Sequence, residues 1–297
     1  MHRTPLQLLH GYGQSPWLEV PSRQGVKGGE LERLVRDHGI RGLSADLALS
    51  DAREACDLLR PIWDCTEGGD GHASISVDPS LVERPNLMVK FPPTPAGLAA
   101  LEDAVAAGIS ADATPIFSLA RYEEVARAYI CGLERLVAAG GSPGAVSSVA
   151  TLHVSPVDAV VDGRLAAIGG SALKLRGRLG IANAKLAHQR QKEIFGSRPW
   201  ELFAARGARP QRCRWASTSG EAAGYCEVIY VEELIGGDSV TSLAPCTLWA
   251  FEDHGVVADN LERGLDEARR LFDDLRTAGV DLDDVWRTLE SRLLPRL

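Results

Sequence analysis

Short runs of apolar and β-branched residues recur along the chain, and turn residues bound each of them. NLMVKFP and VSSVATLHV are examples with the length and composition of β-strands. Eight such strands are predicted, around residue 17 and at 40–45, 72–77, 86–92, 109–116, 146–154, 212–218 and 239–244.

Amphipathic helical segments lie between many of these runs. Apolar residues repeat in them at i, i+3 and i+4, and the segments tend to open after Ser, Asp or Pro and to close at Gly. The predicted helices span 29–39, 51–64, 95–108, 119–140, 179–196, 260–279 and 280–294.

This alternation predicts an α/β protein made of parallel βαβ units. An open, doubly wound sheet usually carries a glycine-rich phosphate turn after its first strand. The GYGQ segment at 11–14 holds two glycines and opens no helix. A closed (β/α)8 TIM-type barrel of about 250 residues fits the length better and leaves room for extra C-terminal helices. We therefore expect residues 1–297 to form a single barrel domain.

One connection departs from the regular pattern. The eight residues 78–85, DPSLVERP, separate two predicted strands. A parallel crossover usually needs about a dozen residues. Extended at roughly 3.3 Å per residue, eight can still cross the barrel wall without a helix. The barrel is therefore expected to be trimmed and irregular, with one helix missing here.

Composition narrows the classes of function. The formal charge of −8 argues against general binding to nucleic acid or to anionic membranes. No apolar run approaches the roughly 20 residues of a membrane span, and the N-terminus lacks the apolar core of a secretory signal, so a cytoplasmic location is expected. The six cysteines are scattered without a CxxC pair, so we predict reduced thiols and no metal site.

Lys90 is the most promising candidate for chemistry. It lies near the end of the apolar run NLMVKFP, and in a barrel the C-terminal end of each strand faces the active site. Desolvation lowers the pKa of a lysine, as imine formation with a carbonyl compound requires. A strand-end lysine that points into solvent is the competing interpretation.

The segment NLMVKFPPTPAGLAALEDAVAAGI resembles the Schiff-base strand and following helix of transaldolases. GQSPWLEV, ATPIFSLARYEEVARAYICGLERL, IANAKLAHQRQKEIF and GVDLDDVWRTLE extend the similarity, particularly to the actinobacterial type. The resemblance implies a (β/α)8 barrel and Schiff-base transfer of a dihydroxyacetone unit between phosphosugars, without metal or organic cofactor. It also implies that Lys90 forms the imine, that Thr114 hydrogen-bonds the catalytic water, and that Ser118 belongs to the site.

Several positions depart from the pattern of this family. Glu19 stands where the resemblance places a catalytic aspartate, and Ser76 where it places the glutamate that orients the water. Asp46 and Asp112 occupy asparagine positions, and Thr151 occupies a serine position. We expect Asp46, Ser76, Asp112, Thr151 and Ser118 to contact the substrate, and Lys90, Glu19 and Thr114 to be catalytic.

The groups expected to bind phosphate are replaced. Pro156 stands in place of an arginine and Glu221 in place of a basic residue, and charge-assisted contacts from such groups are what phosphate recognition depends on. The barrel mouth is expected to be acidic, so its carboxylates would favour the charged form of Lys90. Such a site would take a neutral or cationic carbonyl compound rather than a phosphosugar.

Three functions remain open. The first is a divergent Schiff-base enzyme of specialised metabolism that acts on a small carbonyl or sugar-like substrate. The second is a true transaldolase of the pentose phosphate pathway with a rearranged site. The third is a catalytically silent scaffold or ligand-binding protein. A homodimer is one option for its assembly. His153 is expected inside the barrel, where a structural role is favoured over a catalytic one.

Overall fold

A computed structural model describes residues 3–20, 29–220 and 224–294. Eight parallel strands close into a barrel in chain order, with β1 paired to both β2 and β8. This confirms the predicted (β/α)8 architecture and all eight predicted strands. The strands are β1 Gln14–Val20, β2 Gly42–Ala45, β3 His72–Ile75, β4 Leu87–Phe91, β5 Ser110–Ile116, β6 Ser148–His153, β7 Arg212–Ala216 and β8 Ser239–Leu243.

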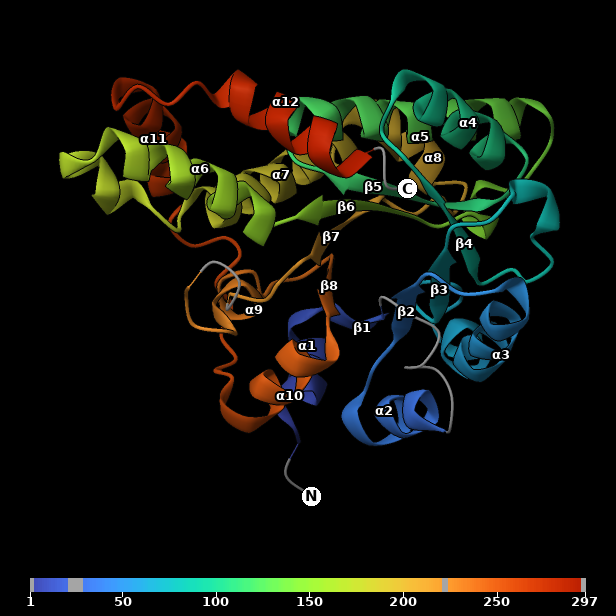
Figure 1. Cartoon of the computed structure of the whole chain (residues 1–297). Helices are drawn as coiled ribbons and strands as arrows, with labels where there is room; N and C mark the ends of the chain where they lie inside the picture. The colour runs from blue at the N-terminus through green and yellow to red at the C-terminus, as the bar shows by residue number, and fades with distance from the viewer. Residues whose placement is uncertain (1–2, 21–28, 221–223, 295–297) are drawn as a thin grey trace.

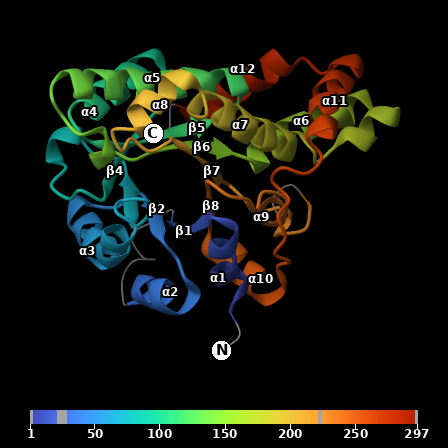
Figure 2. The same ribbon diagram turned by 180° about the vertical axis from the view of Figure 1, so that it is seen from behind.

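Helices surround the ring of strands (Figure 1). The seven predicted helices correspond to α2 Glu30–His38, α3 Leu49–Cys65, α4 Pro95–Ala106, α5 Leu119–Ala138, α7 Leu179–Phe195, α11 Leu265–Thr277 and α12 Leu282–Leu293. N-cap side chains define where three helices begin. The side chains of Thr94, Ser118 and Asp281 each accept a hydrogen bond from a backbone N–H in the first turn of α4, α5 and α12, respectively. The two C-terminal helices lie on the same side of the barrel as α5, α6 and α7 (Figures 1 and 2).

Five helices were not predicted: α1 Pro5–Leu9, α6 Ser155–Ile168, α8 Arg198–Ala204, α9 Ile229–Glu233 and α10 Pro245–His254. Three of them are five to seven residues long, too short to show a clear period. The first turns of α6 contain the Val-rich segment SPVDAVV, which directly continues a strand with similar residues. The basic segment at 173–180 connects α6 to α7 and includes the first two residues of α7.

The connection between β3 and β4 carries one short 3-10 turn, Pro79–Leu81, and no α-helix. The prediction of a missing helix is therefore confirmed. The barrel is closed despite this loss, because Ala73, Ser74 and Ile75 pair directly with β4. None of the helices in the described ranges is long and apolar enough to cross a membrane.

The inside of the barrel is layered. Trp17, Met88, Val149 and Val240 form a small apolar cluster across it. The guanidinium of Arg214 lies over the ring of Trp17, 5.4 Å from its centre. Two larger apolar clusters pack the strands against the surrounding helices. Lys90 lies near the C-terminal end of β4, at the mouth of the barrel above these layers.

Candidate active site

Lys90 is a nearly buried lysine at the C-terminal end of β4. Its side chain is 12% exposed, and Nζ lies 3.6 Å from Oδ1 of Asp46. Nζ also donates to the backbone oxygen of Ala45 at 3.4 Å. The amine opens onto a cavity of about 330 Å³ that Glu19, Asp46, Ser217 and other mouth residues line. The interpretation of Lys90 as a solvent-facing strand end is therefore wrong.

The pKa of Lys90 lies below its ordinary value. Burial is the largest cause, and the positive charge of Arg214 is the second. The carboxylates of Asp112, Asp46 and Glu19 act in the opposite direction, as the sequence led us to expect, but they do not outweigh burial and Arg214. A lowered pKa increases the fraction of free amine, which is the form that attacks a carbonyl carbon.

Asp112 lies below the mouth, in a buried ion pair with Arg214. Nη2 of Arg214 is 2.9 Å from Oδ2 of Asp112, and the two side chains are 3% and 0% exposed. Ser74 and Thr151 each donate a hydrogen bond of 2.6 Å to the same carboxylate, and Nε of Arg214 donates to Thr151. In this structure the polar side-chain atoms of Asp112 and Thr151 are committed to this network, and their contact with the substrate stays a prediction.

The buried pair sets the charge beneath Lys90, so its two members should act on the amine in opposite directions. In Arg214→Met, the pKa of Lys90 rises because a repelling cation is lost. In the matched variant Asp112→Asn, the pKa falls because Arg214 is no longer neutralised. The pH dependence of imine formation measures both shifts. Each variant should also lose about 3–5 kcal/mol of unfolding free energy in denaturant titrations, since one charge stays buried alone. Shifts in the same direction would contradict this arrangement.

A second polar chain lies on the neighbouring strands. Nε2 of His153 is 3.3 Å from Oγ1 of Thr114, and Nδ1 is 2.9 Å from Oγ of Ser217. Burial is the main cause that lowers the pKa of His153 to about 4, with Arg214 and Lys90 acting in the same direction against Glu19. The ring is therefore neutral at physiological pH, with one nitrogen donating and the other accepting. Ser217 holds a left-handed backbone conformation, with φ of 53°, a strained state for a non-glycine residue.

The remaining predicted residues fall into three groups. Glu19 and Asp46 line the cavity with Lys90, as expected. Ser118 is buried and accepts the backbone N–H of Arg121 at the start of α5, which is a structural role. Ser76 is exposed just beyond β3.

Pro156 and Glu221 stand at the two positions where the resemblance places phosphate-binding groups, and the structure describes only Pro156. Pro156 stands in the first turn of α6, where a proline suits the helix start. Glu221 lies outside the described residues.

Sequence reasoning missed Arg214 and Ser217. The signal for Arg214 was present in RCRWA, where an arginine flanked by buried Cys213 and Trp215 requires a buried partner on another strand. For Ser217, we see no signal in the sequence. Among the described residues, no group of three or more His, Cys, Asp or Glu side chains is placed to hold a metal ion.

Comparison with known proteins agrees with this geometry. The family described as Transaldolase/Fructose-6-phosphate aldolase matches residues 29–294. A transaldolase of Parafrankia sp. (strain EAN1pec) is 39% identical, with 96% of this chain and 92% of the relative aligned. A transaldolase of Acidothermus cellulolyticus is 38% identical over 96% of this chain and 91% of its own. "Transaldolase 2" of Nostoc sp. is 34% identical, with 92% and 87% covered. This chain belongs to the transaldolase family, whose members are class I aldolase-type transferases.

Proposed function

We propose that this transaldolase-family enzyme forms a Schiff base between Lys90 and a small carbonyl substrate that carries no phosphate. The imine would serve the transfer, cleavage or formation of a C–C bond, without metal or organic cofactor. The observation that carries the proposal is the environment of Lys90, a nearly buried amine with a lowered pKa that opens onto a cavity at the barrel mouth.

The charge of the cavity supports a substrate without phosphate. Among the described residues that line it, Lys90 is the one cation, and Glu19 and Asp46 are acids. Arg214 lies below and is already paired with Asp112. A phosphate dianion needs several charge-assisted donors, and acidic side chains repel it. A neutral or ammonium-bearing carbonyl compound meets no such repulsion.

Proton transfer at this site can use the groups around Lys90. The free amine attacks the carbonyl carbon to give a carbinolamine, which must lose a hydroxyl group together with a proton, as water, to become the imine. Thr114, His153 and Ser217 form a hydrogen-bonded chain in which a change of imidazole tautomer moves a proton between the two hydroxyls. We assign general acid–base help to this chain and to Glu19, whose carboxylate lines the same cavity.

The test is reductive trapping with a matched series of three-carbon ketones. Dihydroxyacetone, its monophosphate and 1-amino-3-hydroxypropan-2-one share one skeleton and differ in charge. Borohydride reduces the imine to a stable amine, and intact mass gives the extent of trapping. The neutral and amino ketones should be trapped about tenfold or more faster than the phosphate. Added salt should weaken the preference for the amino ketone. Fastest trapping of the phosphate would refute the proposed substrate class.

A genuine pentose-phosphate transaldolase is the second candidate, favoured by the names of the relatives that are 34–39% identical to this chain. A coupled assay with fructose 6-phosphate and erythrose 4-phosphate distinguishes it. Turnover in the usual enzyme range of about 1–10³ s⁻¹ would establish this second function. Turnover far below that range, together with trapping of unphosphorylated ketones, supports the first.

A further inference from the structure

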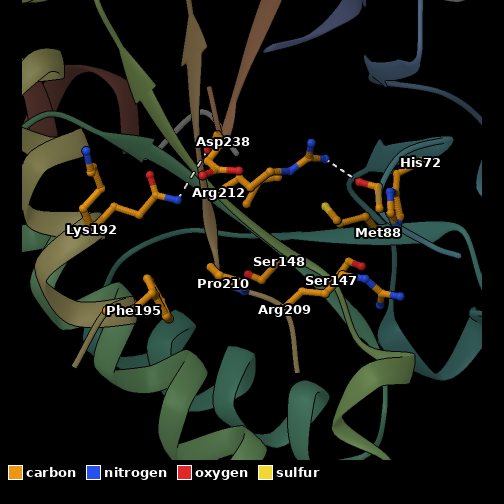
Figure 3. A pocket seen from close by; sticks show the side chains of 14 residues that line it. His72, Met88, Ser147, Ser148, Lys192, Phe195, Arg209, Pro210, Arg212 and Asp238 are labelled. Carbon is orange, nitrogen blue, oxygen red and sulfur yellow. Dashed lines mark hydrogen bonds between the residues drawn. The ribbon is translucent and has the colours of Figure 1, made fainter. Parts of the chain in front are cut away.

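A second cavity opens at the opposite end of the barrel from Lys90. It has a volume of about 410 Å³, within the range of about 300–1,000 Å³ typical of small-molecule sites. Residues at the N-terminal ends of β3, β4, β6 and β7 line it, together with the segment before β7 and the end of α7. It shares no lining residue with the cavity of Lys90. Figure 3 shows His72 and Met88 on one side and Lys192 and Phe195 on the other.

Three cationic side chains from separate segments line this cavity. Lys192 lies on α7, Arg209 in the segment before β7, and Arg212 at the start of β7. An occupant can reach them, because the side chains of Lys192 and Arg212 are 51% and 22% exposed and Arg209 is half-buried. Asp238 is the one acid among the described residues that line the cavity, and it is exposed. The lining therefore carries more positive than negative charge.

The charges of the two arginines are only partly neutralised. Nη2 of Arg212 lies 2.9 Å from Oδ1 of Asp70, but Oδ2 of Asp70 is also 3.7 Å from Nη1 of Arg41. One carboxylate thus serves two guanidinium groups. Arg209 donates to backbone oxygens and makes no ion pair within the described part of the chain. An excess of positive charge remains on the arginine side of the cavity.

Both guanidinium groups reach the same loop before β3. Nη2 of Arg212 donates to the backbone oxygen of Gly69 at 2.7 Å, and Nη2 of Arg209 donates to that of Glu67, two residues earlier. A guanidinium carries five N–H groups. Nε and Nη1 of Arg212 and Nε of Arg209 have no hydrogen-bond partner among the described residues. N–H groups of this kind bind a carboxylate through charge-assisted hydrogen bonds.

The wall of the cavity experiences this positive charge. His72 is buried there, and burial is the largest cause that lowers its pKa to about 3. Arg212 is the second cause and Arg209 acts in the same direction, while Asp70 opposes them. The field of the two arginines therefore extends across this side of the cavity in spite of Asp70.

The opposite side is less suited to an anion. Nζ of Lys192 lies 2.6 Å from Oε1 of Glu262, so its charge is already paired. The carbonyl groups at the C-terminal end of α7 also disfavour negative charge there. In Figure 3 the side chains of Arg209 and Arg212 extend toward the side of His72, and Lys192 lies across from them. An anionic group is therefore expected at the arginines.

The remaining walls are apolar. Met88 and Val149 belong to the buried cluster inside the barrel, and Phe195 and Pro210 also line the cavity. Burying an apolar group against such walls contributes roughly 25 cal/mol per Å². An occupant that joins one negative charge to an apolar body would use both kinds of surface.

We propose that this cavity is a binding site for a small organic monocarboxylate with an apolar body. Arg212 and Arg209 hold the carboxylate, and the body packs against Val149, Pro210 and Phe195. The proposal does not depend on the proposed function of Lys90.

The experiment measures binding of four probes to the full-length protein by calorimetry. Benzoate, benzamide and benzamidinium share a ring and differ in charge, and acetate keeps the carboxylate without the ring. Benzoate should bind with a dissociation constant of about 1–10 mM or tighter, as its size allows. The other three should bind about tenfold more weakly or worse, because each lacks either the charge or the apolar body. Added salt should weaken the binding of benzoate.

Three variants locate the binding. Arg212→Gln removes the charge, while Asp70 keeps Arg41 as a partner, so benzoate should bind about tenfold more weakly or worse. The matched change Arg270→Gln, at an exposed arginine of α11 in an ion pair of 2.9 Å, should leave binding unchanged. Lys90→Met should also leave it unchanged, which separates this cavity from the one at the barrel mouth.

Arg209→Gln gives the same test as Arg212→Gln if the latter does not fold, and the comparison of the four probes needs no variant. The proposal is overturned if benzoate does not bind, or if benzamide, benzamidinium or acetate binds as tightly as benzoate. It is also overturned if neither arginine variant weakens binding, or if Lys90→Met does.

Discussion

Replacing Lys90 with Met will abolish both reductive trapping and turnover. Methionine keeps much of the bulk of the side chain but has no amine, so no imine can form. The loss should be complete within detection, because the reaction has no covalent intermediate without this nitrogen. Intact mass after borohydride treatment measures the adduct, and a turnover assay with the best-trapped ketone measures the rate.

The control for this variant is Lys174→Met. Lys174 is exposed on the 3-10 segment that follows α6. This change should leave trapping and turnover unchanged, since it removes an amine outside the cavity. Persistent trapping in Lys90→Met would show that another group forms the adduct.

Replacing His153 with Phe will lower turnover by about 10²- to 10⁴-fold, the usual worth of general acid–base help. Phenylalanine has a similar flat ring but cannot join Thr114 to Ser217. Lys90 remains in place, so borohydride should still trap an adduct. The kinetic signature is therefore a low kcat with a little-changed KM. His153→Gln, which keeps hydrogen-bonding atoms, should recover part of the rate.

The pH dependence provides a second test of His153. Because its pKa is lowered to about 4, the ring is neutral above that pH and can accept a proton from a hydroxyl. As the pH falls through about 4, the ring becomes protonated and this step is lost. The unsubstituted enzyme should show a decline in kcat there that His153→Phe does not show. Equal profiles in both proteins would mean that His153 serves only packing.

The strands could be predicted because β-branched and small residues between turn signals give a clear pattern, and all eight predictions are confirmed. The depth at which each inward-facing side chain lies inside the barrel could not be predicted from the sequence. Asp112 and Thr114 alternate onto the same face of β5, yet Asp112 lies deeper and pairs with Arg214. That pairing depends on strand register across β5, β6 and β7, which a single sequence does not specify.

The acidic character of the mouth was predicted only in part. Glu19 and Asp46 do line the cavity, but the charge of Asp112 is neutralised from a strand far away in sequence. Burial is the main cause of the lowered pKa of Lys90, and the second cause, Arg214, is a cation that sequence reasoning did not place.

The central claim is that Lys90 is the amine that forms the Schiff base, and the position of the trapped adduct tests it most directly. The chain contains five lysines, so a protease digest read by tandem mass spectrometry can assign the modified one unambiguously. Lys185 is a demanding internal comparison, because it is also buried but is paired with Glu233 at 2.9 Å. After borohydride reduction with dihydroxyacetone, we expect the added mass on Lys90 and on no other lysine. An adduct on Lys185, or one spread over the exposed lysines, would contradict the account.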